Sequence, residues 1–194
     1  MFTCDAVSLA CMDHAEWARE LAERLLAEPL PRRWGHSQGV GRKAESIADV
    51  FGDEAGALVA AAWLHDVGYA PDIAVTGFHP LDGARYLRDV AGAGPLVCSL
   101  VAYHSCADIE ARHRGLAEEL ADEFAPVGGV LSDALTYCDM TTSPDGEPTD
   151  VVARLAEIRS RYGAGHLVAK SMREAGPHIV EAAKRVTELI DARR

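Results

Sequence analysis

The chain has 194 residues, enough for one domain with a substantial core, and its hydrophobic fraction of 48% argues against a disordered chain. Its 19 Lys and Arg residues against 30 Asp and Glu residues give a formal net charge of −11, which argues against a nucleic-acid backbone or an anionic membrane as the main partner. The first residues lack the basic and apolar regions of a signal peptide, and no stretch approaches a membrane span. We therefore expect a cytoplasmic protein.

Helical periodicity runs through the chain and strand signals are almost absent, which predicts an all-α fold, a helical bundle. Asp13 is expected to cap the first helix, Gly52 to end the second, and Pro80 to begin the helix that follows His79. A break is expected at Gly176-Pro177. The expected helices cover 15–27, 34–51, 53–68, 79–90, 95–104, 108–124, 129–142, 151–158 and 180–190.

The turn 143–148 is the clearest internal boundary, because it contains Pro144, Gly146 and Pro148. It divides one compact domain into an N-terminal helix that packs on the core (1–33), a core (34–142) and a C-terminal helical appendage (143–194). The appendage is expected either to close the core or to form the contact of a homodimer. The irregular stretch 69–78 is either a rim beside the site or a plain connector.

Ionisable side chains recur on the apolar stripes of separate expected helices. His65 continues the stripe of Leu58, Ala61 and Ala62 at helical spacing, and alone it would be read as a satisfied core histidine. The same pattern places further residues on the core-facing stripes of three other helices: His36, His104 and Asp139. Imidazoles and carboxylates gathered in an apolar core are hard to satisfy without a metal, so the pattern predicts a metal site.

Four residues form the smallest predicted ligand set, namely His36, His65, Asp66 and Asp139. This mixture of nitrogen and oxygen ligands suits manganese or iron better than calcium, with magnesium, zinc, nickel and cobalt left open. Adding His79 and His104 gives enough ligands for two divalent ions, with Asp66 bridging them. Paired metals can generate a nucleophile from water and bind the oxygens of a phosphoryl group, and they would supply the positive charge that the acidic chain lacks.

The ordered set of His36, the pair His65-Asp66 and the late Asp139 resembles the signature of the HD-domain metal-dependent phosphohydrolases. The resemblance covers roughly 34–142. It implies an all-helical fold and a hydrolase that cleaves a phosphate ester or anhydride through a metal-activated water, with His65 and Asp66 as catalytic residues. The additional His79 and His104 resemble the pattern of binuclear members.

The sequence departs from the pattern of some binuclear members at two adjacent positions. Many binuclear phosphodiesterases have a lysine where this chain has Tyr69, and Ala70 follows instead of the proline of the cyclic-dinucleotide branch. We therefore do not expect hydrolysis of a cyclic dinucleotide, and the resemblance implies a small phosphorylated metabolite or nucleotide as substrate. Candidate substrate-binding residues are Tyr69, and also Arg42, Lys43 and Arg85, each of which is equally compatible with an ordinary surface charge.

Two other functions are compatible with the same ligands. Di-iron oxygenases related to the family have a similar ligand order, and a non-catalytic helical module could use the site for a structural metal or to bind a nucleotide. Phosphohydrolysis is favoured because most of the resembling family performs it, which is an argument by analogy.

Overall fold

The computed structural model describes residues 5–193, with side chains from His14 onward, and confirms the all-α class. The α-helices are α1 Asp5–Leu26, α2 Pro31–Ile47, α3 Ala55–Leu64, α4 His79–Asp89, α5 Pro95–Tyr103, α6 Ala107–Arg114, α7 Ala117–Glu123, α8 Val130–Met140, α9 Val151–Tyr162 and α10 Leu167–Asp191. Short 3-10 segments are η1 Ala48–Glu54, η2 Val67–Tyr69 and η3 His104–Cys106. Within residues 5–193, no helix has both the length and the apolar character needed to cross a membrane.

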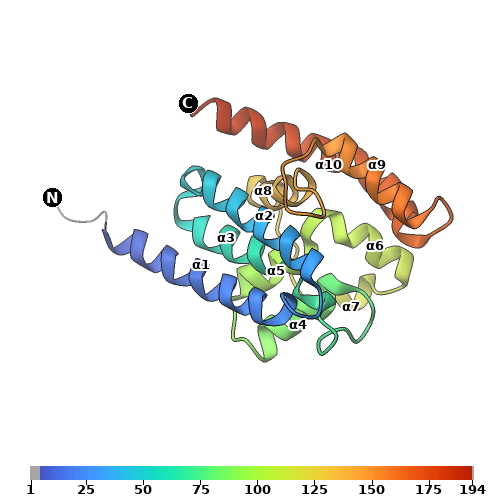
Figure 1. Ribbon diagram of the computed structural model, residues 1–194, viewed down its shortest axis with the longest axis horizontal. Coiled ribbons are helices and arrows are strands. Elements are labelled where there is room, and N and C mark those ends of the chain that lie inside the picture. The colour runs from blue at the N-terminus through green and yellow to red at the C-terminus, as the bar shows by residue number, and fades with distance from the viewer. Residues whose placement is uncertain (1–4, 194) are drawn as a thin grey trace.

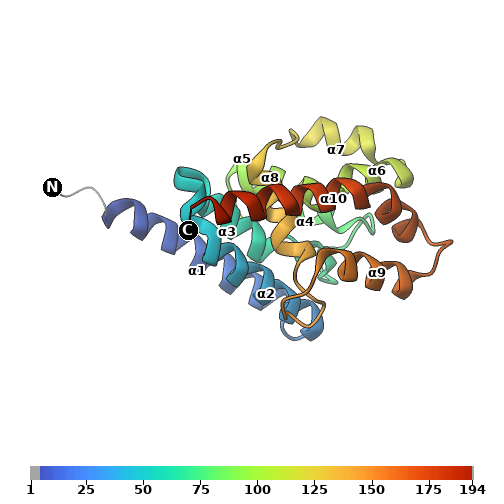
Figure 2. The ribbon, with the colours of Figure 1, turned by 90° about the horizontal axis from the view of Figure 1, so that it is seen from above.

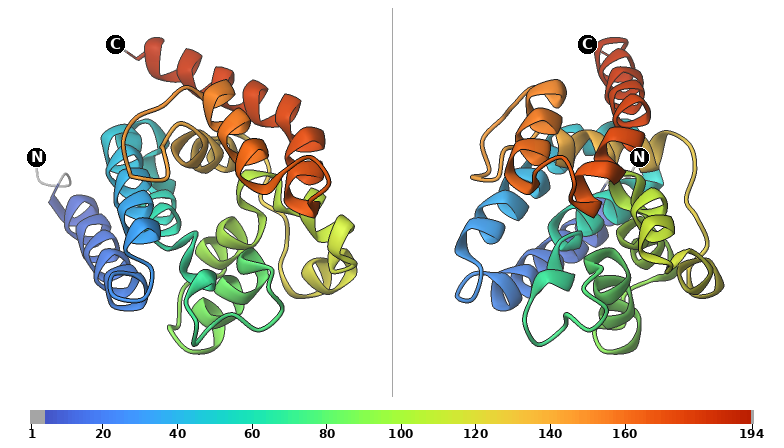
Figure 3. Two further views of the ribbon diagram at one scale, coloured as in Figure 1. Left: turned by 45° about the vertical axis from the view of Figure 1, so that its right-hand side comes forward. Right: turned by 90° about the vertical axis from the view of Figure 1, so that its right-hand side faces the viewer.

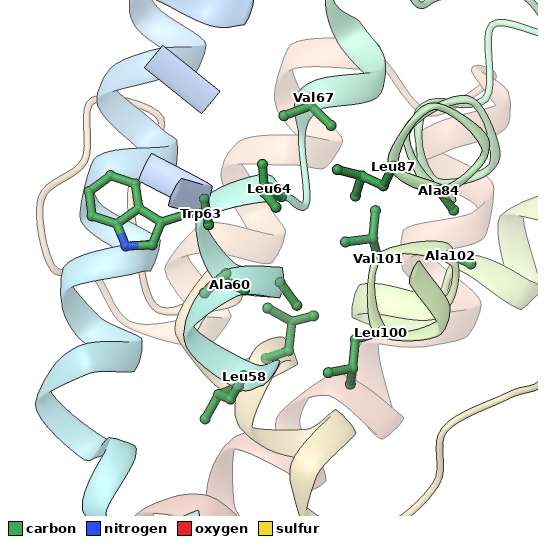
Figure 4. Packing of buried hydrophobic residues seen from close by; sticks show 14 of the residues in the cluster. Leu58, Ala60, Trp63, Leu64, Val67, Ala84, Leu87, Leu100, Val101 and Ala102 are labelled. Carbon is green, nitrogen blue, oxygen red and sulfur yellow. The ribbon is translucent and has the colours of Figure 1, made fainter. Parts of the chain in front are cut away.

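Helix α3 lies in the centre of the molecule and is apolar on all sides, as expected of a core helix. It packs against α1, α2, α5 and α8. Figure 4 shows Trp63 extending from α3 toward α2, while Leu87 of α4 and Val101 of α5 face it from the other side. The residues that follow the end of α3 are therefore held deep in the core.

Helix α2 begins at Pro31, three residues before the start predicted at Trp34. Proline is well suited to the first turn of a helix, since its missing N–H has no partner there in any case. The earlier start corrects the prediction and places Arg33 on the same helix as His36. Close packing then fixes α2 against α3, because a Cβ atom on Gly41 would collide with the ring of Trp63.

The central helix ends earlier than predicted. It was expected to continue to about Gly68, but α3 stops at Leu64 and His65 is its C-terminal cap residue. Asp66 then leaves the helical region, with φ −104° and ψ 4°, and the chain turns into η2. His65 and Asp66 thus lie on a turn in the core, where adjacent side chains can point to different parts of one site.

Three other predicted boundaries were wrong. Helix α1 begins at Asp5, well before Asp13, and the polar helix over 108–124 is two helices, since Gly115 takes φ +73° at the end of α6. The break at Gly176-Pro177 does not occur, and α10 continues through Pro177. A proline inside a helix costs about 3 kcal/mol, and the burial of Ala175 and Ile179 on either side of it compensates.

Helices α9 and α10 lie across the molecule from α4 and α7 (Figure 1), and α10 runs along α8 (Figure 2). A second apolar cluster joins them to the core. It contains Ile109 of α6, Met140 of α8, Leu155 and Ile158 of α9, and Met172, Ala175 and Ile179 of α10. The C-terminal helices are thereby packed next to η3 and the end of α8, the segments that contain His104 and Asp139.

Replacement of Gly68 by alanine tests the close approach that positions His79. A Cβ atom on Gly68 would collide with the carbonyl oxygen of His79 and lie 2.6 Å from the amide nitrogen of Gly83, both of them backbone atoms. We expect Gly68→Ala to lower the free energy of unfolding by about 1–3 kcal/mol, as overpacking does. Gly165→Ala, where a Cβ atom would meet open space, is the control, and urea unfolding is the measurement. Equal stability of the two variants would contradict this account.

Candidate metal centre

The structure brings all six predicted metal ligands into one cluster. They come from five parts of the chain: His36 from α2, His65 and Asp66 from the turn after α3, His79 from the start of α4, His104 from η3 after α5, and Asp139 from the last turn of α8. All are buried except His79, whose side chain is 15% exposed. In the left-hand view of Figure 3 these elements form a ring together with the C-terminal helices.

Three histidines of the cluster share one hydrogen-bonding pattern. In each, the Nδ1 atom donates to a backbone carbonyl oxygen: His36 to Ser143 at 2.9 Å, His65 to Ala62 at 2.8 Å and His104 to Val101 at 2.7 Å. A proton on Nδ1 leaves the Nε2 lone pair free, which is the usual arrangement of metal-ligating imidazoles. The Nε2 atom of His65 is fully buried and has no hydrogen-bond partner. A buried acceptor without a partner is costly, and a metal ion would satisfy it.

Asp66 belongs to two groups of candidate ligands, one with His36 and His65 and the other with His79 and His104. Its Oδ2 atom is 3.4 Å from His65 Nε2 and 4.0 Å from His36 Nε2, while its Oδ1 atom is 3.3 Å from His79 Nε2. The Nε2 atoms of His79 and His104 are 3.2 Å apart. Within each group, the potential ligand atoms lie within 4.8 Å of one another. The two oxygens of one carboxylate therefore face different groups, as a bridging ligand requires.

Asp139 belongs to the cluster but lies outside these two tight groups. Its Oδ1 atom is 3.0 Å from His36 Nε2, and its Oδ2 atom accepts a 2.5 Å hydrogen bond from the hydroxyl of Ser105. Ser105 has φ +51° and Cys106 has φ +61°, a backbone region that non-glycine residues rarely adopt. Such strain is typical of functional sites, and here it places the Ser105 hydroxyl on Asp139. No pattern in the sequence pointed to Ser105.

The protonation states of the cluster follow from burial and from the charges nearby. Burial alone would raise the pKa of Asp66, but Arg33 and His65 hold that pKa well below its usual range. Burial likewise acts against the charged form of Asp139, yet the close contact with His36 and the charge of His65 keep its pKa low. Burial lowers the pKa of His79 and of His104, so both are neutral imidazoles at neutral pH. For His65, burial is outweighed by Asp66, and the pKa is raised.

Arg33 is a site residue that the sequence analysis missed. Its Nη1 atom donates to Asp66 Oδ2 at 2.8 Å, and its guanidinium lies 4.1 Å from the ring centroid of Tyr69. Burial would lower its pKa, but the charge of Asp66 outweighs burial and raises it. Tyr69 in turn stacks on His79 with ring centroids 4.0 Å apart. Arg33 could have been predicted from its position three residues before His36, since residues at this spacing share one face of a helix. That inference requires the helix to begin at Pro31.

A cavity of about 80 Å³ opens onto the cluster. Its polar and ionisable lining comes from the cluster, from residues beside it on α2, η2, η3 and α6, and from α9: Arg33, Asp66, Tyr69, His79, His104, Ser105, Glu110, Asp139, Arg154, Arg161 and Tyr162. Of the candidate substrate-binding residues, only Tyr69 lines this cavity.

The structure places the other three candidates elsewhere. Arg42 bonds to Gln38 on the exposed face of α2, and the Nζ atom of Lys43 donates to Thr141. Arg85 pairs with Glu119 and Glu123 of α7. Each cation is thus directed to a partner outside the cavity, so proximity in sequence to a metal ligand did not place these side chains at the site.

Comparison with known proteins gives one match. A family model described as HD domain matches residues 33–159, a span that contains all six predicted ligands, Arg33 and most of α9. No curated protein and no solved structure matches the chain.

Metal content tests whether the two groups each hold an ion. We expect about two equivalents of transition metal per wild-type chain and about one in the double variant His79→Ala/His104→Ala, because the group of His36, His65 and Asp66 stays intact. The control is His14→Ala/His113→Ala, which removes two imidazoles outside the cluster. Elemental analysis of protein purified without added metal is the measurement. One equivalent in all three proteins would confine metal binding to a single group.

Proposed function

The chain belongs to the HD-domain family, and from that premise we propose that it is a metal-dependent phosphohydrolase of a small phosphorylated compound. The observation that carries the proposal is the buried Nε2 atom of His65, which has no partner and lies beside a carboxylate shared by two ligand groups. Divalent ions held by these residues, with manganese or iron expected, would supply a nucleophilic water at neutral pH and neutralise the charge on phosphoryl oxygens.

The protein's own residues would bind and orient the phosphoryl group. Arg33 lines the cavity and uses one N–H on Asp66, and its guanidinium has further donors that can reach phosphoryl oxygens. The Tyr69 ring lies between Arg33 and His79 and limits the movement of both. Ser105 holds the carboxylate of Asp139 in one orientation.

Loss of a proposed ligand should abolish turnover without unfolding the protein. We expect His65→Ala and Asp66→Ala to reduce phosphate release from p-nitrophenyl phosphate and a panel of phosphorylated metabolites by more than about 100-fold, with the helical circular dichroism signal unchanged. The expected loss exceeds the roughly 10–100-fold caused by removing residues that only support metal ligands. His113→Ala, on the exposed face of α6, is the control. Full activity in either ligand variant, or oxygen consumption in place of phosphate release, would contradict the proposal.

Arg33 can be tested against its neighbour in the sequence. Arg33→Gln should lower kcat/KM by roughly 10–100-fold, because hydrogen bonds to a charged group are worth about 1.5–3 kcal/mol. Arg32→Gln should have almost no effect, since Arg32 pairs with Asp145 on the surface and both side chains are about two-thirds exposed. Metal content must stay constant in both variants. Loss of metal from Arg33→Gln would show that Arg33 only orients Asp66, contrary to the role proposed.

A further inference from the structure

We propose that helix α9 supplies a second anion-binding subsite in the cavity, so that the substrate carries a second anionic group beside the phosphoryl group at the metal cluster. The proposal rests on the proposed function and names its substrate class. The subsite consists of Arg154 and Arg161, with Tyr162 beside them, and all three line the same cavity as Asp66 and His79. None of the site residues predicted from the sequence lies in this part of the chain.

Arg154 is the central observation. Its side chain is only 5% exposed, its Nη1 atom donates to Glu157 at 2.5 Å, and its buried Nε atom has no hydrogen-bond partner. An arginine in this state destabilises the folded protein, because the buried donor loses its hydrogen bonds to water and gains none within the protein. An anion in the cavity that this residue lines would supply the missing acceptor.

The charge around Arg154 favours an anion. Glu157 also accepts hydrogen bonds from Arg161, at 2.9 Å and 2.7 Å, so one carboxylate serves two guanidinium groups. Both arginines line the cavity and Glu157 does not, and two guanidinium groups against one carboxylate give this group of three side chains a net positive charge. The remaining carboxylate in this part of the lining, Glu110, is already paired with Arg114 at 2.7 Å. The planar fork of arginine matches the oxygens of a phosphate or carboxylate.

The size of the cavity limits the substrate. A volume of about 80 Å³ is well below the roughly 300–1,000 Å³ of pockets that enclose drug-sized ligands. With α9 in this position, the cavity suits a short molecule whose two anionic groups are separated by few atoms. The second group can be a phosphoryl group or a carboxylate, since both present the oxygens that arginine recognises.

Binding of compounds that cannot be hydrolysed tests the subsite independently of turnover. The probes are methylphosphonate, with one anionic group, and methylenebisphosphonate and phosphonoacetate, with two. Affinities are measured by calorimetry on manganese-loaded protein. We expect wild type to bind one of the two-anion probes at least about tenfold more tightly than methylphosphonate, as one charge-assisted hydrogen bond allows. Whichever of these two probes binds more tightly identifies the second group as phosphoryl or carboxylate.

Single substitutions on α9 then locate the origin of this preference. Arg154→Gln and Arg161→Gln should each remove most of it, while the affinity for methylphosphonate stays within about twofold. Arg159→Gln changes an exposed arginine of the same helix that does not line the cavity, and it should behave as wild type. Metal content and the melting temperature are measured for each variant. If Arg154→Gln does not fold, the partly exposed Arg161 decides the question, because its replacement leaves the buried packing unchanged.

Glu157→Gln gives a test of opposite sign. It should release both arginines from the shared carboxylate and raise the affinity for the two-anion probe by about tenfold. The proposal is overturned if wild type shows no preference for two-anion probes, or if the preference survives in both arginine variants. If the preference depends on the arginines but the protein hydrolyses no phosphate ester, the subsite is supported and the proposed function is refuted. If the protein hydrolyses phosphate esters but shows no such preference, the proposed function is supported and the subsite is refuted.

Discussion

The fold places an imidazole and a carboxylate, His65 and Asp66, directly after a helix that is apolar on every side. Both side chains are buried, so groups of the protein must satisfy most of their polar atoms. The Nδ1 atom of His65 uses the carbonyl of Ala62 in its own helix, and Asp66 is paired with Arg33 from α2. The Nε2 atom of His65 is left without a protein partner. Four other parts of the chain contribute imidazole or carboxylate groups to the same cluster, and a metal ion is the simplest way to satisfy this excess of acceptors.

Close backbone packing gives this cluster its precision. Gly41 lets α2 approach the ring of Trp63, and Gly68 lets η2 lie against the backbone of His79 and Gly83. These contacts set the distances between α2, α3 and α4, and with them the positions of His36, Asp66 and His79. The strained turn at Ser105 has the same effect on the other side, where it fixes Asp139. The geometry of the site therefore depends on backbone shape as much as on the ligands themselves.

The sequence predicted the helical class and the positions that gather in the cluster, because both depend on a periodic pattern within one helix. His36, His65, His104 and Asp139 could be found from apolar stripes alone. Ser105 and Arg154 could not, because their roles arise from contacts between segments far apart in the chain or from an unusual backbone conformation, and Arg33 could be found only with the helix start placed at Pro31. Pro177 shows the limit of local rules: it breaks helices by itself, yet the packing of α10 on α8 keeps the helix continuous.

Net charge is a poor guide to the ligand of this protein. A chain of −11 predicts an acidic surface, yet three arginines line the cavity at the cluster and balance its three carboxylates. Arg33 comes from the start of the region that matches the HD family and Arg154 from near its end, while Arg161 lies just beyond it. The ligands that would carry the chemistry thus belong to the shared core, whereas the cations that would select the substrate lie toward its edges. Such a division allows one catalytic core to serve different substrates, since the helix that closes the cavity can change without disturbing the buried cluster.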